Sequence, residues 1–231
     1  MWSDAKTTLA QLAAKGPQVG EQVEVSPEAI YQRMNKQALA FLQEMIRQTL
    51  AKVQSLATVC EDNLFTSFAK VYLADSTGFG LPESLKDTFP GSGGSAAKAG
   101  AKIQAVWDYK SSVLGHFVLT PWNIPDNTYV ETVVALAQKG VLFLWDLGYC
   151  KVHAFAQIAA AGAYFFSRLN HQTNIYETVA GRLTPIALAS VLKTVQGTLV
   201  EQNICVGAKD QVVSRLIASR VPEARVSKNG H

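Results

Sequence analysis

Cysteine, charge and long apolar runs are all scarce in this 231-residue chain, and each shortage excludes a class of protein. Three cysteines, Cys60, Cys150 and Cys205, stand far apart with no C-x-x-C pair, which argues against a disulfide framework and favours a reducing compartment. Charged residues make up 17% of the chain, below the roughly 25% of an average soluble domain, which excludes a highly charged solvating protein. The 48% of hydrophobic residues is enough to bury a real core.

No segment of the sequence predicts a membrane span or a secretory signal. The longest apolar stretch, residues 154–166, is interrupted by Gln157 and is shorter than the roughly 20 residues that a span needs. The first residues, MWSDAKTTLAQ, lack the basic and then apolar pattern of a signal peptide. We therefore expect a cytoplasmic protein with no membrane partner.

The net charge of +3 is too small to predict nucleic-acid binding by itself. The excess lies in the last quarter of the chain, where residues 171–231 carry seven basic and four acidic side chains. If DNA is the partner, local basic patches must hold it, because the net positive charge of the whole protein is too small to attract DNA strongly.

The first 59 residues have the pattern of helices. Ser3 and Asp4 can cap a first helix, and Ser26 followed by Pro27 is a strong start signal for a second. A short helix, a turn and a long helix form the order of a helix-turn-helix DNA reader. Residues 1–70 carry seven basic and seven acidic side chains, a net charge of zero, so we favour the alternative that these helices cover the core.

Beyond this region the apolar pattern changes to that of strands. Residues 70–75 predict a short strand that stops at Asp75, and residues 81–101 have the composition of a loop. Residues 101–109 and 113–120 have the pattern of a hairpin. The elements expected next are a helix at 131–139, a strand at 141–145 that stops at Asp146, a helix at 152–161 and a strand at 163–169.

This order of elements predicts an α/β fold of the ribonuclease H-like type, with a mixed sheet. Right-handed crossovers would lay the strand at 141–145 beside the strand at 70–75, in parallel. Neighbouring parallel strand ends lie about 5 Å apart. Asp75 and Asp146 are therefore expected to face one another at the carboxyl edge of the sheet.

A small second unit is expected after Asn170. Thr184 and Pro185 have the pattern of a helix start, and residues 199–206 and 211–221 predict a pair of strands. The expected organisation is a helical N-terminal region at 1–66, a core at 67–170 and a strand-rich unit at 171–231.

Two carboxylates at the ends of buried strands are costly, because close like charges repel and each needs a partner. A divalent cation resolves both problems, and hard oxygen ligands select Mg²⁺ or Mn²⁺. Two such ions about 3.5–4 Å apart can clamp the attacking and leaving oxygens of a phosphodiester. We expect Asp75 and Asp146 to be metal ligands. The structural alternative is that each aspartate only caps the turn that follows it.

Other chemistry-bearing residues carry weaker signals. Lys98 and Lys102 lie beside the Gly/Ser-rich segment 91–95, where they can touch phosphates or can simply be solvated. The four histidines share no metal-ligand spacing, and Cys150 has no nearby histidine to activate it. We expect three tryptophans to pack in the core: Trp107, Trp122 and Trp145.

Three segments resemble the catalytic core of DDE-type bacterial insertion-sequence transposases: VYLADSTGF, AKIQAVWDYKSS and VLFLWDLGYCKVHAFAQIAAAGAYFFSRLN. They are most similar to the family named for insertion sequence four. The first acid of that family, followed by Ser or Thr, matches Asp75. Its Asp-x-Gly-Tyr motif matches Asp146, Gly148 and Tyr149, and its strand ending in Arg matches Arg168. The likeness covers about residues 20–222.

The resemblance implies metal-dependent cutting and joining of DNA at transposon ends, in which water and then a 3′ hydroxyl attack the phosphodiester. It implies Asp75 and Asp146 as catalytic metal ligands, Mg²⁺ or Mn²⁺ as the cofactor, and DNA as the partner. Lys98, Lys102 and Arg168 are the expected DNA contacts, and a homodimer on DNA is left open.

The resemblance also implies a strand-rich insertion followed by a third acid. Residues 171–222 resemble the start of that insertion, and no residue matches the third acid. We therefore expect a transposase shortened at its C-terminus. The alternative is a non-catalytic remnant that binds DNA or a full-length partner. A phosphatase with Asp75 as nucleophile is weaker, because Thr77 stands where its usual second aspartate would be.

Overall fold

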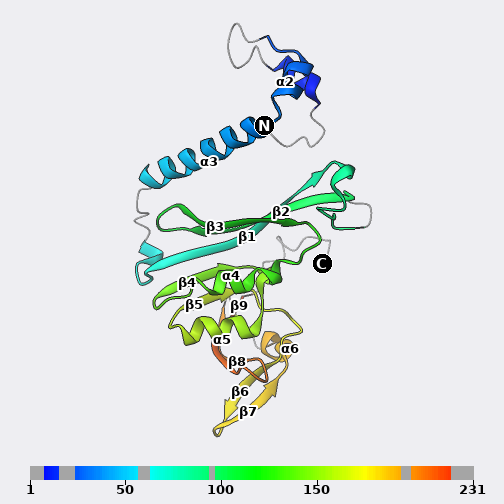
Figure 1. Ribbon diagram of the computed structural model, residues 1–231. Helices are drawn as coiled ribbons and strands as arrows, with labels where there is room; N and C mark the ends of the chain where they lie inside the picture. The colour runs from blue at the N-terminus through cyan, green and yellow to red at the C-terminus, as the bar shows by residue number, and fades with distance from the viewer. Residues whose placement is uncertain (1–7, 16–23, 57–62, 94–96, 194–198, 220–231) are drawn as a thin grey trace. The chain divides into compact units, whose positions relative to one another are not determined.

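The structure is a computed structural model that describes residues 8–15, 24–56, 63–93, 97–193 and 199–219. Its strands form two sheets, with the orders β3-β2-β1-β4-β5 and β7-β6-β8-β9 (Figure 1). The chain divides into two compact units. One comprises residues 1–66 and 75–125, and the other comprises residues 67–74 and 126–231. The order of the five-stranded sheet confirms the expected ribonuclease H-like arrangement of a mixed α/β fold.

The first unit begins with three helices, α1 (Leu9–Ala14), α2 (Pro27–Arg33) and α3 (Lys36–Leu56). The hydroxyl of Ser26 accepts a hydrogen bond from the Ala29 N–H at 3.1 Å, which confirms the start signal expected for α2. Thr8 caps α1 in the same way. The caps expected at Ser3 and Asp4 lie outside the described residues.

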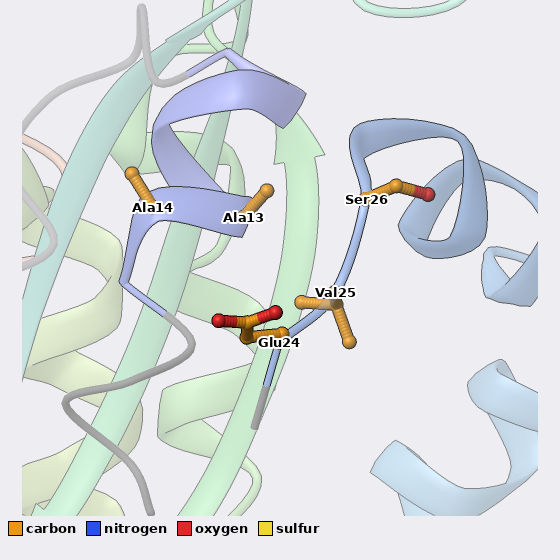
Figure 2. A pocket seen from close by; sticks show the side chains of 5 residues that line it. All are labelled: Ala13, Ala14, Glu24, Val25 and Ser26. Atoms are coloured by element: carbon orange, nitrogen blue, oxygen red, sulfur yellow. The ribbon is translucent and has the colours of Figure 1, made fainter. Parts of the chain in front are cut away.

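A hollow of about 520 Å³ lies between the end of α1 and the start of α2 (Figure 2). Its lining consists of Ala13, Ala14, Glu24, Val25 and Ser26. The Ser26 hydroxyl is already engaged in capping α2, so Glu24 supplies the remaining polar side chain of this lining. The hollow therefore offers few polar groups that could bind a ligand.

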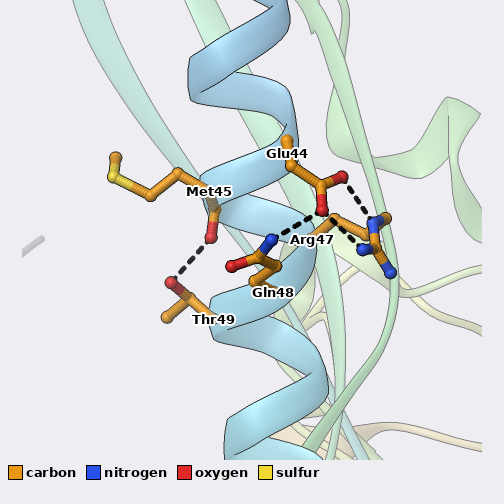
Figure 3. Close-up of polar contacts among 5 residues, drawn as sticks. All are labelled: Glu44, Met45, Arg47, Gln48 and Thr49. Carbon is orange, nitrogen blue, oxygen red and sulfur yellow. Dashed lines mark hydrogen bonds and ion pairs between the residues drawn. The ribbon is translucent and has the colours of Figure 1, made fainter.

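Polar side chains on α3 are linked to one another along the helix (Figure 3). Arg47 donates two hydrogen bonds to the Glu44 carboxylate, at 2.7 and 2.6 Å, and Gln48 donates a third at 2.7 Å. The bonds from Arg47, followed by that from Gln48, lower the pKa of Glu44 to about 2. These side chains lie on the exposed surface of the helix.

The apolar side chains of α3 are exposed, contrary to the expectation that these helices cover the core. Leu39 is 56% exposed, Phe41 67% and Ile46 51%. A helix that covered a core would bury such residues. Within the described residues, α3 therefore leaves most of its apolar side chains in solvent, although Leu50 is half-buried.

Strand β1 (Lys70–Leu81) continues well past Asp75, where we expected it to stop. The residues after Asp75 include Thr77, Phe79 and Leu81, which favour strands. Gly78 belongs to this strand because an indole lies against it: a Cβ there would be 2.8 Å from Trp122 Cε2. A glycine that signals a loop in the sequence thus permits close packing inside a strand.

The expected hairpin is confirmed as β2 (Ala99–Asp108) and β3 (Val113–Pro121), which pair antiparallel. Between β1 and this hairpin the chain forms a short 3₁₀ turn, η3 (Glu83–Leu85). One face of β2 is polar as well as buried, since it carries Gln104 at 0% exposure and Asp108 at 7%.

The second unit contains β4 (Val141–Trp145), β5 (Tyr164–Ser167), α4 (Val130–Val134) and α5 (Val152–Ala160). The first residues of β1 pair in parallel with β4, as expected, and β4 pairs in parallel with β5. Helix α5 lies beside these strands (Figure 1). Its Phe155 ring stacks on that of Phe165 in β5, with 4.2 Å between the ring centroids. Helix α4 ends five residues before the predicted boundary.

Two further 3₁₀ turns in this unit flank its helices. Turn η4 (Asp126–Thr128) leads into α4, and η5 (Leu147–Tyr149) joins β4 to α5. Tyr129, which directly follows η4, is 7% exposed, and Tyr149, the last residue of η5, is 1% exposed. Burial raises the pKa of the Tyr129 hydroxyl.

The second sheet contains β6 (Ile175–Val179), β7 (Arg182–Ile186), β8 (Val200–Val206) and β9 (Val212–Ala218). The helix start predicted at Thr184 and Pro185 is wrong, because both residues lie in β7 and the helix α6 is Leu188–Lys193. Strand β7 is at the edge of its sheet, where a proline is tolerated. The predicted pairing of β8 with β9 is confirmed.

Candidate metal centre and DNA-contact residues

Asp146 follows β4, a strand of five apolar residues, and begins the turn η5. Its Oδ1 accepts a hydrogen bond from the Gly148 N–H at 2.8 Å. The carboxylate is exposed, whereas Trp145 before it is only 6% exposed. The sequence therefore places a solvated acid directly at the end of a buried strand, as predicted.

Asp75 lies within β1 rather than at its end, and its side chain is also exposed. Its Oδ1 accepts a hydrogen bond from the Ser76 N–H at 2.7 Å. The last residue pair between β1 and β4 is Ala74 with Trp145. Each aspartate is therefore the residue that directly follows the last pair of the parallel ladder.

Each carboxylate accepts a backbone hydrogen bond with one oxygen and keeps its second oxygen for a cation, and such oxygens suit a hard cation. The second oxygens of Asp75 and Asp146 have no hydrogen-bond partner among the residues that the structure describes. In those same parts of the chain there is no group of three or more His, Cys, Asp or Glu side chains that could hold a metal ion.

A further carboxylate, which sequence reasoning missed, approaches the turn at Asp146. Asp126 begins η4, and its Oδ2 lies 3.2 Å from the point that a Cβ on Gly148 would occupy. The sequence carries no signal for this approach, because it depends on how two turns meet in the fold.

The part of the chain that contains both aspartates matches the model of a known protein family. The family described as "Transposase DDE domain" matches residues 66–219, about two thirds of the chain. The chain belongs to the DDE transposase family. Domains of this family depend in general on a divalent metal ion.

Curated relatives of the chain are described as transposases of insertion sequence elements. The transposase for insertion sequence element IS231F of Bacillus thuringiensis subsp. israelensis is 29% identical over 88% of this chain and 46% of its own length. The transposase for IS1151 of Clostridium perfringens is 27% identical over 95% of this chain and 50% of its own length. The chain therefore spans about half the length of these relatives.

One solved structure also aligns with the transposase domain, although weakly. Ciona intestinalis endonuclease V, crystallised with DNA, shares 10% identity and a TM-score of 0.26, over 76% of this chain and 82% of that chain. This similarity is too low to support a conclusion about fold or function.

The three expected DNA contacts of the transposase domain differ in their surroundings. Lys98 is exposed and forms an ion pair with Glu83 at 2.7 Å. Arg168 is exposed at the end of β5. Lys102 is only 9% exposed, and its Nζ donates to the Ile124 carbonyl at 3.0 Å, so it stabilises the chain segment after β3. Burial makes Lys102 unsuited to a phosphate contact.

The remaining candidates have structural environments. His153 pairs with Glu131 at 2.7 Å, between α5 and α4. Cys150 is half-buried, and burial raises the pKa of its thiol, against a smaller lowering by a backbone hydrogen bond at Asn170. Cys205 is buried, whereas Cys60 lies outside the described residues.

Of the three tryptophans expected in the core, only Trp145 is fully buried there. Trp122 is half-buried, and Trp107 is 37% exposed, so its expected core position is wrong. The reason is alternation along β2, where Val106 and Asp108 take the buried face and Trp107 points the other way. None of the described helices is long and apolar enough to cross a bilayer.

Proposed function

We propose that Asp75 and Asp146 bind Mg²⁺ or Mn²⁺ and are two of the three acids of a site for cutting and joining DNA at transposon ends, the third of which is missing from this chain. The observation that carries the proposal is the parallel register of β1 and β4, which ends one residue before each aspartate. Neighbouring strands are about 4.8 Å apart, a spacing at which two carboxylates can share one cation. The cation, when bound, supplies Lewis-acid stabilisation of the phosphodiester.

The hydrogen bonds of the two aspartates support this role. The Ser76 and Gly148 N–H groups each hold one carboxylate oxygen, which orients the other oxygen without neutralising the charge. Both carboxylates remain exposed and so are accessible to a metal ion and to a phosphate group. The two backbone N–H groups thus orient both carboxylates before a metal ion binds.

We propose that DNA contacts exposed basic side chains of the chain. Arg168 is exposed near the end of β5, and Lys98 is exposed although paired with Glu83. Because phosphate contacts release counterions, the affinity for DNA is expected to fall steeply as salt rises. We further propose a cytoplasmic location and assembly of two copies on DNA.

A second candidate function is DNA binding without cleavage. It is favoured by one observation: the described residues offer no group of three potential metal ligands. A cation held by two aspartates is positioned less firmly than one held by three, and positioning supplies much of the rate in phosphoryl transfer. We expect the 231-residue chain to bind DNA and to leave it intact.

The metal site is tested by titrating Mg²⁺ or Mn²⁺ into the full chain and into Asp75→Ala, Asp146→Ala and the double variant. We expect weak binding by the parent chain and none by the double variant. An Asp210→Ala variant serves as the control, because Asp210 is exposed in the turn between β8 and β9. Unchanged binding in the double variant would refute the metal site.

The activity is tested with a labelled duplex that carries transposon ends, incubated with Mg²⁺ or Mn²⁺. We expect binding that weakens with salt, and neither nicking nor joining. Robust strand cleavage that is lost in Asp75→Ala would show instead that the chain holds a complete catalytic site.

A further inference from the structure

Asp126 and Asp146 come from different turns and converge on one glycine. A Cβ on Gly148 would lie 3.1 Å from Asp146 Oδ1 and 3.2 Å from Asp126 Oδ2. Because both oxygens are this close to a single point, they can be at most about 6 Å apart, a range in which like charges perturb each other. Asp126 is therefore an electrostatic neighbour of Asp146.

Buried residues anchor both turns, so the approach of the two acids is built into the fold. The Asp126 carbonyl accepts a hydrogen bond from the Tyr129 N–H at 2.9 Å, and Tyr129 is 7% exposed. On the other side, Tyr149 is 1% exposed and ends the turn that Asp146 begins. The buried tyrosines thus fix the backbone of both turns.

We propose that Asp126 is a positioning residue for the cation at Asp146, and that it acts by holding a water molecule of the hydrated ion. The proposal rests on the metal site assigned to Asp146 above. Mg²⁺ keeps several waters and uses only one or two carboxylates as direct ligands. The Asp146 and Asp126 oxygens lie at most about 6 Å apart, and a metal–oxygen bond of about 2.1 Å followed by a hydrogen bond of about 2.8 Å spans about 5 Å, so a water on an ion bound at Asp146 can reach Asp126.

The surroundings of Asp126 fit this indirect role. The described residues contain no group of three direct metal ligands, so Asp126 is not a third direct ligand. Its carboxylate has further interactions within the protein, and a carboxylate has about four acceptor sites, so a water can be held in addition. Partners of this kind tune metal affinity, and their removal typically costs about 10–100-fold.

Gly148 belongs to the same arrangement, because both carboxylates approach it closely. With an alanine, a methyl group would sit 3.1 and 3.2 Å from the two oxygens, which is tighter than an ordinary contact. The carboxylates would have to shift by a few tenths of an ångström. Gly148→Ala is therefore expected to weaken metal binding with both acids still present.

The test is a Mn²⁺ titration of the full chain, in which free Mn²⁺ is followed by electron paramagnetic resonance. Asp126→Asn preserves the shape of the side chain and removes its charge. We expect its Kd for Mn²⁺ to rise about tenfold or more, with an unchanged melting temperature in metal-free buffer. Asp126→Glu is expected to recover part of the affinity. The matched control, Asp210→Asn, removes one exposed charge from the same unit and should leave the Kd within about twofold.

The outcomes separate this proposal from the one it rests on. If Asp126→Asn binds Mn²⁺ as the parent does while Asp146→Asn does not, Asp126 has no role and the metal site stands. If Asp146→Asn also binds normally, the metal site itself is wrong. If Asp126→Asn lowers the metal-free melting temperature, Asp126→Glu decides: recovered Mn²⁺ affinity in that variant supports the positioning role, and affinity as weak as that of Asp126→Asn overturns it.

Discussion

Trp122 provides the sharpest test of packing in the first unit, because its indole lies against two glycines. A Cβ on Gly100 would be 2.3 Å from Trp122 Cε3 and 3.2 Å from the carbonyl oxygen of Phe79. The Trp122 N–H also donates to the Gly100 carbonyl at 2.9 Å, which holds the two backbones together. In Gly100→Ala the ring must therefore move while its own backbone stays in place.

The expected cost follows from the overlap. Carbon atoms in contact are ordinarily about 3.5–4.0 Å apart, so the added methyl group would overlap the indole by more than about 1 Å. Overpacking of this kind costs about 1–3 kcal/mol. The lower entropy of alanine in the unfolded chain offsets about 0.4–1 kcal/mol of this. We expect Gly100→Ala to lower the free energy of unfolding by about 1–2 kcal/mol.

The assay is urea unfolding followed by circular dichroism, with Gly80→Ala as the matched control. A Cβ on Gly80 would meet its nearest atom, the Cβ of Ala97, at 3.4 Å, so that variant is expected to be neutral or slightly stabilised. In a Trp122→Ala background the ring is absent, and Gly100→Ala should then cost little. An equal loss of stability in both backgrounds would refute the steric explanation.

Three further predictions concern single side chains. The pKa of Glu44 is lowered from 4.5 to about 2, so its stabilising contribution is present above about pH 4.5 and is lost as the pH falls toward 2; an NMR titration of Arg47→Gln should show this pKa rising toward its ordinary value. The thiol of Cys150, with its pKa raised by burial, should react slowly with iodoacetamide at neutral pH, and rapid labelling in a mass-spectrometric time course would contradict this. Phe143 is fully buried between Tyr72 and Trp145, so Phe143→Ala should cost about 3–5 kcal/mol in chemical unfolding, and a loss below about 1 kcal/mol would contradict that packing.

The elements that could be predicted from the sequence are those whose signal is local. The strand at 141–145 is a continuous apolar run followed by an acid, and the structure gives it the same limits. The start of α2 could be predicted because Ser26 accepts a hydrogen bond from a near neighbour, Ala29, and Pro27 suits the first helical position. The parallel pairing of β1 with β4 followed from the handedness of crossovers, which is a general property of such folds.

The elements that were missed depend on neighbours far away in the sequence. Strand β1 runs past Asp75 because Trp122, more than forty residues later, packs against its glycine at 78. Residues 182–186 form a strand because β6 pairs with them, although Thr184 and Pro185 also resemble a helix start. Propensity over a few residues cannot decide such cases, since tertiary pairing overrides it.

Lys102 shows how the same limitation affects the candidate site. Its charge and its position beside a Gly/Ser-rich loop favoured a contact with DNA, yet the fold buries it and uses it to bind the carbonyl of Ile124. Ile124 lies two residues before Asp126, so this buried hydrogen bond holds the chain just ahead of the turn that carries the acid. A lysine interpreted as a ligand for phosphate thus holds a backbone segment in place. Local patterns and family motifs can predict Asp75 and Asp146 as candidates, whereas the neighbours of these acids become evident only when separate turns are seen to meet.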